Sequence, residues 1–415
     1  MSIPILALIP SGYKGQTSTS PQVYSVLPSN GSADFAFNRN NGLATRVNKD
    51  KLIEEVANDT PRLNYLNSTC PSLLLEKRST NLQVYSQELE KQEWFKLRTT
   101  VTSNDTTSPS GVVNADKLQR TSTIASYIQD GFSKNASQIQ YTTSIFVKQG
   151  NVDFLSLRAQ GSYSNRIDLR FQFSTKSFIF TNEAGTAVLN STSVTEFSNG
   201  WFKISYSFLS DTVNALQSYF SPRETSGNVD SNDTSSTAFV YLWGCQVEES
   251  TFGTSYIPTE NTAQTRFGDT CIGGVDATLF NITEGSFFID VLPFNNGIVN
   301  TISLSNSTTS QRILIQFQSN GTQVRLFSSG GVSNYQTITF NQRNKILVTF
   351  KLNEYKFYIN GALVSTDTSA TVPTGLDRVN FSNSAANSDF FQGEVNDTRV
   401  YDKVLTQAEA IKLTI

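Results

Sequence analysis

Short runs in which apolar and polar residues alternate recur through most of the chain, and this pattern constrains the fold more than any other sequence feature. Between Arg166 and Phe173, apolar Ile, Leu and Phe alternate with Arg, Asp and Gln, and the run WFKISYSF from Trp201 to Phe208 has the same period of two. Such a period separates the side chains of a strand onto two faces. Each run therefore predicts a β-strand with one face in a core and the other in solvent.

Turn signals separate these runs at the intervals of a β-sandwich. The Asn360-Gly361 pair is the strongest hairpin signal, because both residues tolerate the positive φ of a tight turn. After Leu405, Thr406 and Glu409 have the spacing of a helix capping box. The pattern predicts an all-β fold of two consecutive β-sandwich (jelly-roll) domains, at residues 79–266 and 267–415. The polar segment SYIPTENTAQTR, residues 255–266, is interpreted as a linker or closing turn.

Residues 1–78 lack this periodicity. They include one short apolar and acidic patch, KLIEEVAND from Lys51, and the run Leu73-Leu74-Leu75, which should be buried. This content is too small for a separate core, so we expect an irregular N-terminal attachment or assembly segment. It would pack against the chain's own second domain, a symmetry mate or, as we favour, an assembly partner.

The composition excludes several classes of function. The chain has no histidine, which removes the commonest general base and all imidazole metal sites. Its formal net charge is −3 without long runs of one sign, which excludes a nucleic-acid partner. No apolar run approaches the roughly 18 residues of a membrane span, and the opening residues lack the basic region of a signal peptide. Three scattered cysteines indicate reduced thiols.

Two phrases near the C-terminus resemble a known family. One is the hairpin KFYINGALVST, preceded by KILVTFKL, and the other is FQGEVNDTRVYDKVLTQAEA. They are similar to the laminin-G-like, concanavalin A-like domains of bacterial and phage proteins. The matching positions are Phe391, Gly393, Val395, Arg399, Tyr401, Leu405 and Glu409. The resemblance implies a concanavalin-type β-sandwich over residues 267–415.

The middle region resembles the carbohydrate-binding-module-like jelly rolls of phage structural proteins, through SNGWFKISYSF and YLWGCQVEESTFGTSYIPT. Cys245 and Ser250 replace an alanine and a glycine of that family's phrase, without consequence for the fold. Upstream, ATRVNKDKLIEEVANDTPRLNYL resembles the leader that precedes this domain in phage tail, fibre and virion proteins. The resemblance implies a virion component of fibre, spike or receptor-binding type, usually a homo-oligomer and often a trimer.

Aromatic side chains are the first candidates for sugar contact, because sugar-binding sandwiches stack pyranose rings on exposed rings. Trp94, in KQEWFKL, and Tyr163, in the loop GSYSNR, are the ligand-binding candidates. Trp201 and Trp243 lie in phrases that recur with the fold, so we expect them to pack in the core or at its edge.

Acidic residues suggest two further kinds of site. Ca²⁺ could bind at Asp230-Ser231-Asn232-Asp233 or at Asn396-Asp397, although these residues are also ordinary turn formers. No cofactor is assigned beyond this open calcium hypothesis. The acids of QELEKQE imitate the paired carboxylates of glycosidases, but this run is more typical of a solvated helical turn. They are Glu88, Glu90 and Glu93.

Three functional hypotheses follow. The preferred one is a non-enzymatic phage virion protein, assembled in the host cytoplasm, displayed on the virion surface and attached to other virion proteins by its N-terminus. It would present its sandwiches to host cell-surface polysaccharide. The first alternative is a purely structural capsid or tail decoration protein without a glycan ligand. The second is a polysaccharide depolymerase that uses carboxylates alone.

Overall fold

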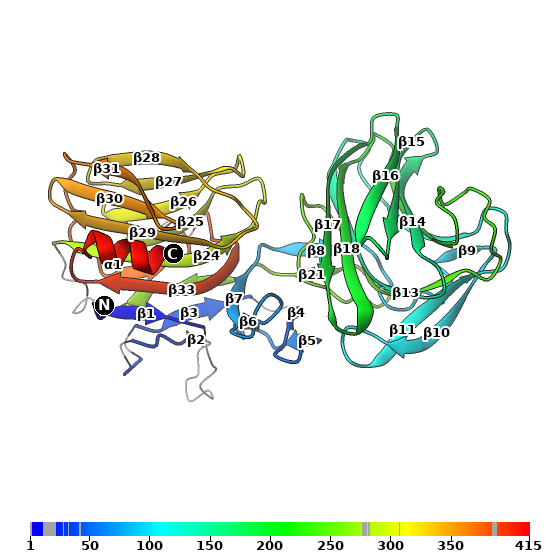
Figure 1. Cartoon of the computed structure of the whole chain (residues 1–415), viewed down its shortest axis with the longest axis horizontal. Coiled ribbons are helices and arrows are strands. Elements are labelled where there is room, and N and C mark those ends of the chain that lie inside the picture. Colours follow the sequence, from blue (N-terminus) through cyan, green and yellow to red (C-terminus); the bar gives the residue numbers. More distant parts are fainter. Residues whose placement is uncertain are drawn as a thin grey trace. The chain divides into compact units, whose positions relative to one another are not determined.

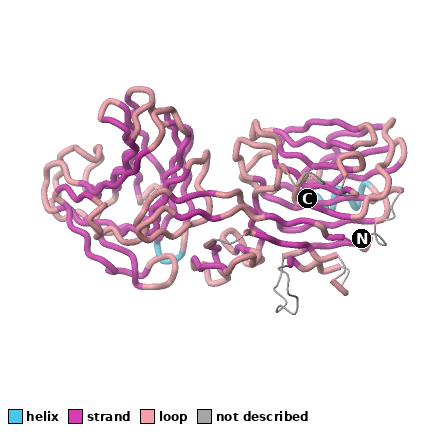
Figure 2. Tube along the Cα trace, turned by 180° about the vertical axis from the view of Figure 1, so that it is seen from behind, coloured by secondary structure: helices cyan, strands magenta, loops and turns pink. Residues whose placement is uncertain are grey.

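The computed structural model describes residues 2–415 except 11–21, 28, 32, 41–42, 276–279, 281–282, 307 and 384–387, and only the backbone of 180–181 and 274–275. The described residues are nearly all in strands, turns and loops (Figures 1 and 2), which confirms the all-β prediction. The chain divides into two compact units. The middle unit contains residues 43–55 and 79–266, and the C-terminal unit contains residues 1–42, 56–78 and 267–415.

Two six-stranded antiparallel sheets form the middle unit. The first sheet has the order β10 (Thr99–Thr107), β11 (Val113–Arg120), β20 (Phe239–Glu248), β13 (Gln140–Gln149), β18 (Trp201–Leu209) and β17 (Val188–Glu196). The second has the order β16 (Ser177–Ala184), β15 (Asn165–Gln172), β14 (Phe154–Ser162), β19 (Ala215–Arg223), β12 (Tyr127–Ser133) and β9 (Phe95–Leu97). Smaller elements are the pairs β4 (Ala44–Val47) with β5 (Ile53–Val56) and β8 (Ser79–Asn81) with β21 (Gln264–Arg266), and the 3-10 helix η1 (Ser198–Gly200).

The predicted alternation decides which side chains enter the core of the middle unit. Ile167 and Leu169 of β15 and Ile204 of β18 all belong to one buried cluster between the sheets. The other face of β18 is not in solvent, however. Lys203 Nζ donates to the carbonyl of Thr254 at 2.5 Å, and Ser207 Oγ donates to that of Thr251 at 2.9 Å. The solvent-facing prediction is wrong here because the segment after β20 folds back across this face.

The C-terminal unit is also built from two large sheets. The first has the order β31 (Ala362–Asp367), β30 (Glu354–Ile359), β29 (Asn344–Lys351), β24 (Gly285–Pro293), β33 (Gly393–Tyr401), β7 (Ser72–Leu75) and β6 (Arg62–Asn64), with β1 (Leu6–Leu8) also paired to β33. The second has the order β23 (Gly274–Val275), β32 (Arg378–Asn380), β25 (Asn300–Ser305), β26 (Arg312–Phe317), β27 (Gln323–Ser328) and β28 (Val332–Thr337). A small sheet joins β2 (Gln22–Val23), β3 (Phe35–Asn38) and β22 (Thr270–Ile272).

Strands from the N-terminal residues complete the first of these sheets. β7 pairs with the beginning of β33, at residues 393–395, and β1 pairs with its end, at residues 398–400. These pairings use the backbone groups of an otherwise open strand edge and bury Leu6, Leu8 and Leu73 in the core. The structure therefore corrects the expected three-part division. Residues 1–78 are not a separate attachment segment, whereas the boundaries at 79 and 266 coincide with those of the units.

A buried charge network ties the N-terminal residues of this unit to residue 269. Asp269 accepts hydrogen bonds from Arg39 Nε at 3.0 Å, from Arg62 Nη2 and from the backbone amide of Glu76 at 2.9 Å. Arg62 also donates to the Glu76 carboxylate at 2.6 Å. Burial lowers the pKa of Arg62, but the two carboxylates outweigh it and the net pKa is raised. The guanidinium therefore stays charged inside the protein.

Two local predictions in the C-terminal unit are confirmed. Asn360 and Gly361 form the turn between β30 and β31, with φ of 46° and 84°. Helix α1 (Gln407–Thr414) begins after Thr406, and Thr406 and Glu409 make both hydrogen bonds of a capping box. The helix packs against the first sheet, where Ala410 lies in one buried cluster with Phe288. Within the part of the chain that the structure describes, no helix combines the length and apolarity of a membrane span.

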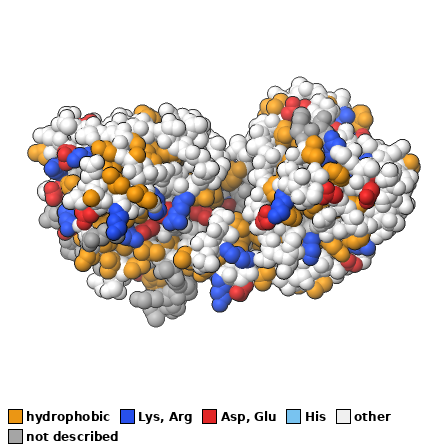
Figure 3. Space-filling view, in the orientation of Figure 1, with side chains coloured by type: hydrophobic (Ala, Val, Ile, Leu, Met, Phe, Trp, Pro, Cys, Tyr) orange, Lys and Arg blue, Asp and Glu red, His pale blue; other side chains and the backbone are white. Residues whose placement is uncertain are grey.

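Charged side chains of both signs are interspersed over the described residues of the face drawn in Figure 3. No extended patch of one sign dominates that face. It therefore lacks the cationic stripe that a nucleic-acid-binding surface presents.

Candidate functional site

The tryptophans are buried. Trp94 is 1% exposed, its Nε1 donates to the carbonyl of Tyr85 at 3.0 Å, and its ring lies 6.1 Å from that of Phe220. It therefore has no open ring face for a sugar, which corrects the prediction that Trp94 contacts a ligand. Trp201 and Trp243 are each 1% exposed, as expected for core residues.

Tyr163 lies in the open, at the turn between β14 and β15, and is 64% exposed. The guanidinium carbon of Arg166 lies 4.2 Å from its ring centroid and that of Arg158 lies 5.7 Å away. The ring is thus held by cation–π contacts. Tyr163 stays a ligand-binding prediction, and it does not line the pocket described next.

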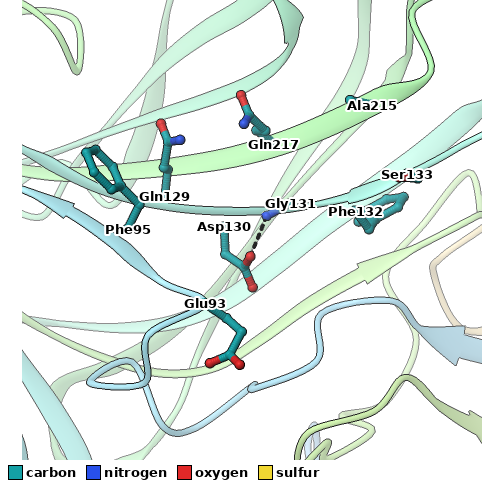
Figure 4. Close-up of a pocket in the computed structure, with 9 residues that line it drawn as sticks. All are labelled: Glu93, Phe95, Gln129, Asp130, Gly131, Phe132, Ser133, Ala215 and Gln217. Carbon is teal, nitrogen blue, oxygen red and sulfur yellow. Dashed lines mark hydrogen bonds between the residues drawn. The ribbon is translucent and has the colours of Figure 1, made fainter.

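The pocket lies at the edge of the second sheet of the middle unit. β9 pairs only with residues 127–129 of β12, so the remainder of β12 has no second strand partner among the described residues. A pocket of about 320 Å³ lies at this edge (Figure 4). Its lining residues are Glu93, Phe95, Gln129, Asp130, Gly131, Phe132, Ser133, Ala215 and Gln217.

One side of this pocket combines an exposed ring with side-chain amides. Phe95 is 51% exposed and lies directly across from Gln129, and Gly131 lies across from Gln217. In Figure 4 the amides of Gln129 and Gln217 point away from the carboxylates of Asp130 and Glu93. Strand alternation explains this separation, since residues 129 and 130 must face opposite ways. An apolar ring beside amides is suited to a sugar, which offers a C–H face and hydroxyl groups.

Neighbouring side chains orient the amide of Gln217. Tyr219 Oη donates to Gln217 Oε1 at 2.8 Å, and Gln160 Nε2 donates to Tyr219 Oη at 3.1 Å. Gln160 Oε1 in turn accepts from Arg158 at 3.4 Å. Because Oε1 of Gln217 already accepts a hydrogen bond, its NH₂ group faces the pocket as a donor.

Gly131 leaves room that no other residue would leave. A Cβ atom at this position would lie 2.4 Å from the carbonyl oxygen of Leu216 and 2.7 Å from Cγ of Gln217. A larger residue would therefore displace strand β19 or the side chain of Gln217, whose amide lines the pocket. The glycine keeps both strands close and the pocket floor open.

The other side of the pocket is acidic. The pKa of Asp130 is raised to about 6, chiefly by burial; hydrogen bonds from the Gly131 amide and Gln83 oppose this rise, and the charge of Glu93 adds to it. The Gly131 amide donates at 2.7 Å. Of the three acids noted in the sequence, Glu93 alone lines the pocket; the other two pair with Lys91, at 3.2 Å for Glu88 and 4.0 Å for Glu90.

The first calcium candidate is occupied by an arginine. The guanidinium of Arg223 donates to the carbonyls of Thr225, Asn228, Ser231 and Asn232, at 2.5–3.1 Å. Asp233 accepts from the backbone amides of residues 224, 225 and 234, and Asp230 pairs with Arg158 at 3.0 Å. A cation is already present where the carbonyls converge, so this loop is not arranged to hold Ca²⁺.

The second calcium candidate is also neutralised by arginine, since Asp397 pairs with Arg399 at 2.6 Å. Among the described residues, no group of three or more His, Cys, Asp or Glu side chains has the arrangement of a metal site.

Sequence reasoning missed Phe95, Gln129, Asp130 and Gln217. Trp94 and Phe95 are adjacent, and the larger ring is the more obvious candidate. Phe95 begins β9 and faces outward with Leu97, whereas Trp94 precedes the strand and turns into the core. The alternation of Phe95, Lys96 and Leu97 is too short to assign a face from the sequence.

Comparison with known proteins supports the fold of the C-terminal unit. Residues 286–410 match a family model described as the Concanavalin A-like lectin/glucanases superfamily, of laminin G type. The match confirms the resemblance of this sandwich and covers less than half of the chain. A search of curated proteins found no match.

Several solved structures are similar in part. The carbohydrate-binding module CBM40 of a Ruminococcus gnavus sialidase, bound to sialyllactose, is 19% identical, with a TM-score of 0.30 over 34% of this chain and 86% of that one. Domain 4 of a Geobacillus stearothermophilus arabinanase is 16% identical, with a TM-score of 0.29 over 40% and 82%. A putative carbohydrate-binding protein from Bacteroides ovatus is 10% identical, with a TM-score of 0.28 over 80% and 84%. At these scores the ligands of those proteins carry no argument for this one.

Proposed function

We propose that the protein is a glycan-binding protein and that the pocket at Phe95 binds an uncharged sugar without turnover. The observation that carries this proposal is the exposed Phe95 ring directly across from Gln129, beside the oriented amide of Gln217. The ring stacks on the apolar face of a pyranose, and the amides bond its hydroxyl groups. Glu93 and Asp130 make the pocket acidic, which disfavours sialic and uronic acids.

Replacing Phe95 with alanine should weaken glycan binding about tenfold, because an aromatic anchor contributes on the order of 1–2 kcal/mol. The measurement is a glycan-array screen with the full chain, followed by isothermal titration with the best neutral oligosaccharide. Tyr163→Ala is the matched control, since this ring is also exposed but lies outside the pocket. Loss of binding in the control with retention in Phe95→Ala would contradict the assigned pocket.

Binding at this pocket should strengthen as the pH rises through about 6, the pKa of Asp130. The ionised carboxylate accepts hydrogen bonds from the Gly131 amide and Gln83, which hold this strand edge in place, so the pocket is best ordered above this pKa. We expect an increase of a few-fold in affinity between acidic and neutral pH. In Asp130→Asn the profile should be flat over the same interval, and a persistent step there would show that another group titrates.

A second candidate function is hydrolysis, which is favoured by the two carboxylates, Glu93 and Asp130, that line one pocket. One acid with a raised pKa beside a second carboxylate is the combination that glycosidases use. Release of reducing ends from a bound polysaccharide, abolished in Asp130→Asn, would establish this activity. Binding without such release supports the non-enzymatic proposal.

We further propose that the chain acts as a virion surface protein of fibre or spike type, as a homo-oligomer, with a trimer favoured, that engages host cell-surface polysaccharide. The resemblance of its sequence phrases to phage structural proteins supports this part. Residues 1–42 and 56–78 belong to the C-terminal unit, so contact with other virion proteins would use a face of that sandwich. Sedimentation velocity tests the assembly, and a monomer at micromolar concentration would count against the trimer.

A further inference from the structure

A second group of aromatic and basic side chains lies on the outer face of the second sheet of the C-terminal unit. The strands β26, β27 and β28 pair in that order, with Arg325 directly across from Tyr335 and Phe327 directly across from Leu314. The alternate residues of these strands, such as Ile313, Val324 and Leu326, belong to the core. The side chains of Arg312, Arg325, Phe327 and Tyr335 therefore project from the opposite face.

These four side chains form a ladder in which arginines and rings alternate. The guanidinium carbon of Arg325 lies 4.7 Å from the ring centroid of Phe327 and 5.4 Å from that of Tyr335. The guanidinium carbon of Arg312 lies 5.5 Å from the Phe327 centroid. Tyr335, at the end of the ladder, is 48% exposed. Cation–π contacts hold the guanidinium groups in place and leave an accessible ring beside them.

The charges of this ladder are not neutralised by ion pairs within the described residues. The sandwich at 267–415 has five arginines. Three of them pair with aspartates: Arg343 with Asp290, Arg378 with Asp377 at 2.6 Å and Arg399 with Asp397 at 2.6 Å. Arg312 and Arg325, the two on the ladder, bond neutral acceptors instead, at Asn383, Ser333 and Gln316. Asp389 raises the pKa of Arg312 through its charge but forms no ion pair with it among the described residues, and it accepts a hydrogen bond from Asn383 at 2.9 Å.

Two like charges on one face repel each other, and an oxyanion would relieve that repulsion. The pKa of Arg312 is lowered, chiefly by burial; Asp389 raises it in part, and the neighbouring Arg325 lowers it. A guanidinium has a planar set of donors that matches a carboxylate or sulfate group. An exposed ring at the end of the ladder can stack on the sugar that carries the anion.

We propose that this arginine–aromatic ladder, Arg312, Phe327, Arg325 and Tyr335, is a second glycan site that binds the sulfate or carboxylate group of an acidic polysaccharide. It is independent of the pocket at Phe95, which is acidic and takes uncharged sugars. The two sites differ in charge and lie in different units.

The test is binding of the full chain to immobilised heparin, which is sulfated, to polygalacturonate, which is carboxylated, and to dextran, which is neutral. We expect binding to at least one acidic polymer and none to dextran through this site, with loss at high salt. Arg325→Gln should weaken the binding about tenfold, since it removes a charge-assisted contact. Preference for heparin or for polygalacturonate identifies the anion.

Arg378→Gln is the matched control, because it removes the same charge from the same sheet but at a position paired with Asp377. It should change the affinity less than twofold if only the ladder binds. Equal losses in the two variants would show attraction by net charge and overturn the proposal, as would failure of the unaltered protein to bind either acidic polymer. Tyr335→Ala should also weaken binding, and Phe95→Ala should not, which separates this site from the pocket.

Discussion

Replacing Asp269 with asparagine is expected to destabilise the C-terminal unit by about 3–5 kcal/mol, the cost of breaking a buried ion network on one side. The Asp269 and Arg39 side chains are both 0% exposed, and Arg62 is equally buried. Asparagine can keep one acceptor but loses the charge, so the buried guanidinium groups of Arg39 and Arg62 both lose the Asp269 carboxylate, while Arg62 keeps its bond to Glu76. The network also joins residues that are far apart in the sequence. Its loss should therefore weaken the docking of β6 and β7 as well.

Urea unfolding followed by two probes measures this effect. All three tryptophans lie in the middle unit, so tryptophan fluorescence reports on that unit, whereas circular dichroism reports on both. In Asp269→Asn, the unfolding transition of the C-terminal unit should move to a lower urea concentration. Circular dichroism detects this transition, whereas tryptophan fluorescence does not. Asp377→Asn removes a carboxylate from a partly exposed pair and should cost only about 0–1 kcal/mol. Similar shifts in both variants would refute a special role for the buried network.

Replacing Arg223 with methionine should destabilise the middle unit by about 3 kcal/mol, because several buried carbonyls and Asp233 lose their shared donor. The guanidinium of Arg223 is 1% exposed and lies 3.9 Å from Asp233. It closes the loop that follows β19. The same loop contacts the second sheet, through Ser156 and through Arg158, which donates to Asp230. Opening the loop should therefore also disturb the hydrogen-bond chain from Arg158 to Gln217.

Tryptophan fluorescence during urea unfolding reports this loss of stability, and hydrogen exchange of residues 224–234 reports the opening of the loop. Arg170→Met is the control, since Arg170 donates to Ser226 of the same loop but does not hold its carbonyls. It should cost less than about 1 kcal/mol. If exchange in the loop is unchanged in Arg223→Met, the guanidinium is not what orders it.

The Arg223 site also explains why the sequence suggested calcium at residues 230–233. A loop rich in Asp, Ser and Asn provides carbonyl and carboxylate oxygens whether its cation is a metal ion or a guanidinium. Arg223 belongs to β19, before the loop begins. Its role as the donor to the loop carbonyls becomes visible only in the folded structure, where the loop closes around the guanidinium.

Features that depend on a few consecutive residues were determined by the sequence itself. The alternation in β15 selects Ile167 and Leu169 for the core, Asn360-Gly361 makes the turn after β30, and Thr406 with Glu409 begins helix α1. Backbone conformation and local hydrogen bonds decide these features within a few positions. The concanavalin-like sandwich at the C-terminus was recognisable for a related reason, since its hairpin and closing strand are continuous phrases.

Only the tertiary structure decided which surfaces are open and where residues 1–78 belong. β1 and β7 join β33 across more than three hundred residues of sequence, and Asp269 binds Arg39 and Arg62 over separations of 230 and 207 residues. Trp94 is buried and Phe95 is exposed because of how the chain enters β9. Strand edges and ring faces are covered by segments that are distant in the sequence, and a local sequence pattern does not show which segment that is.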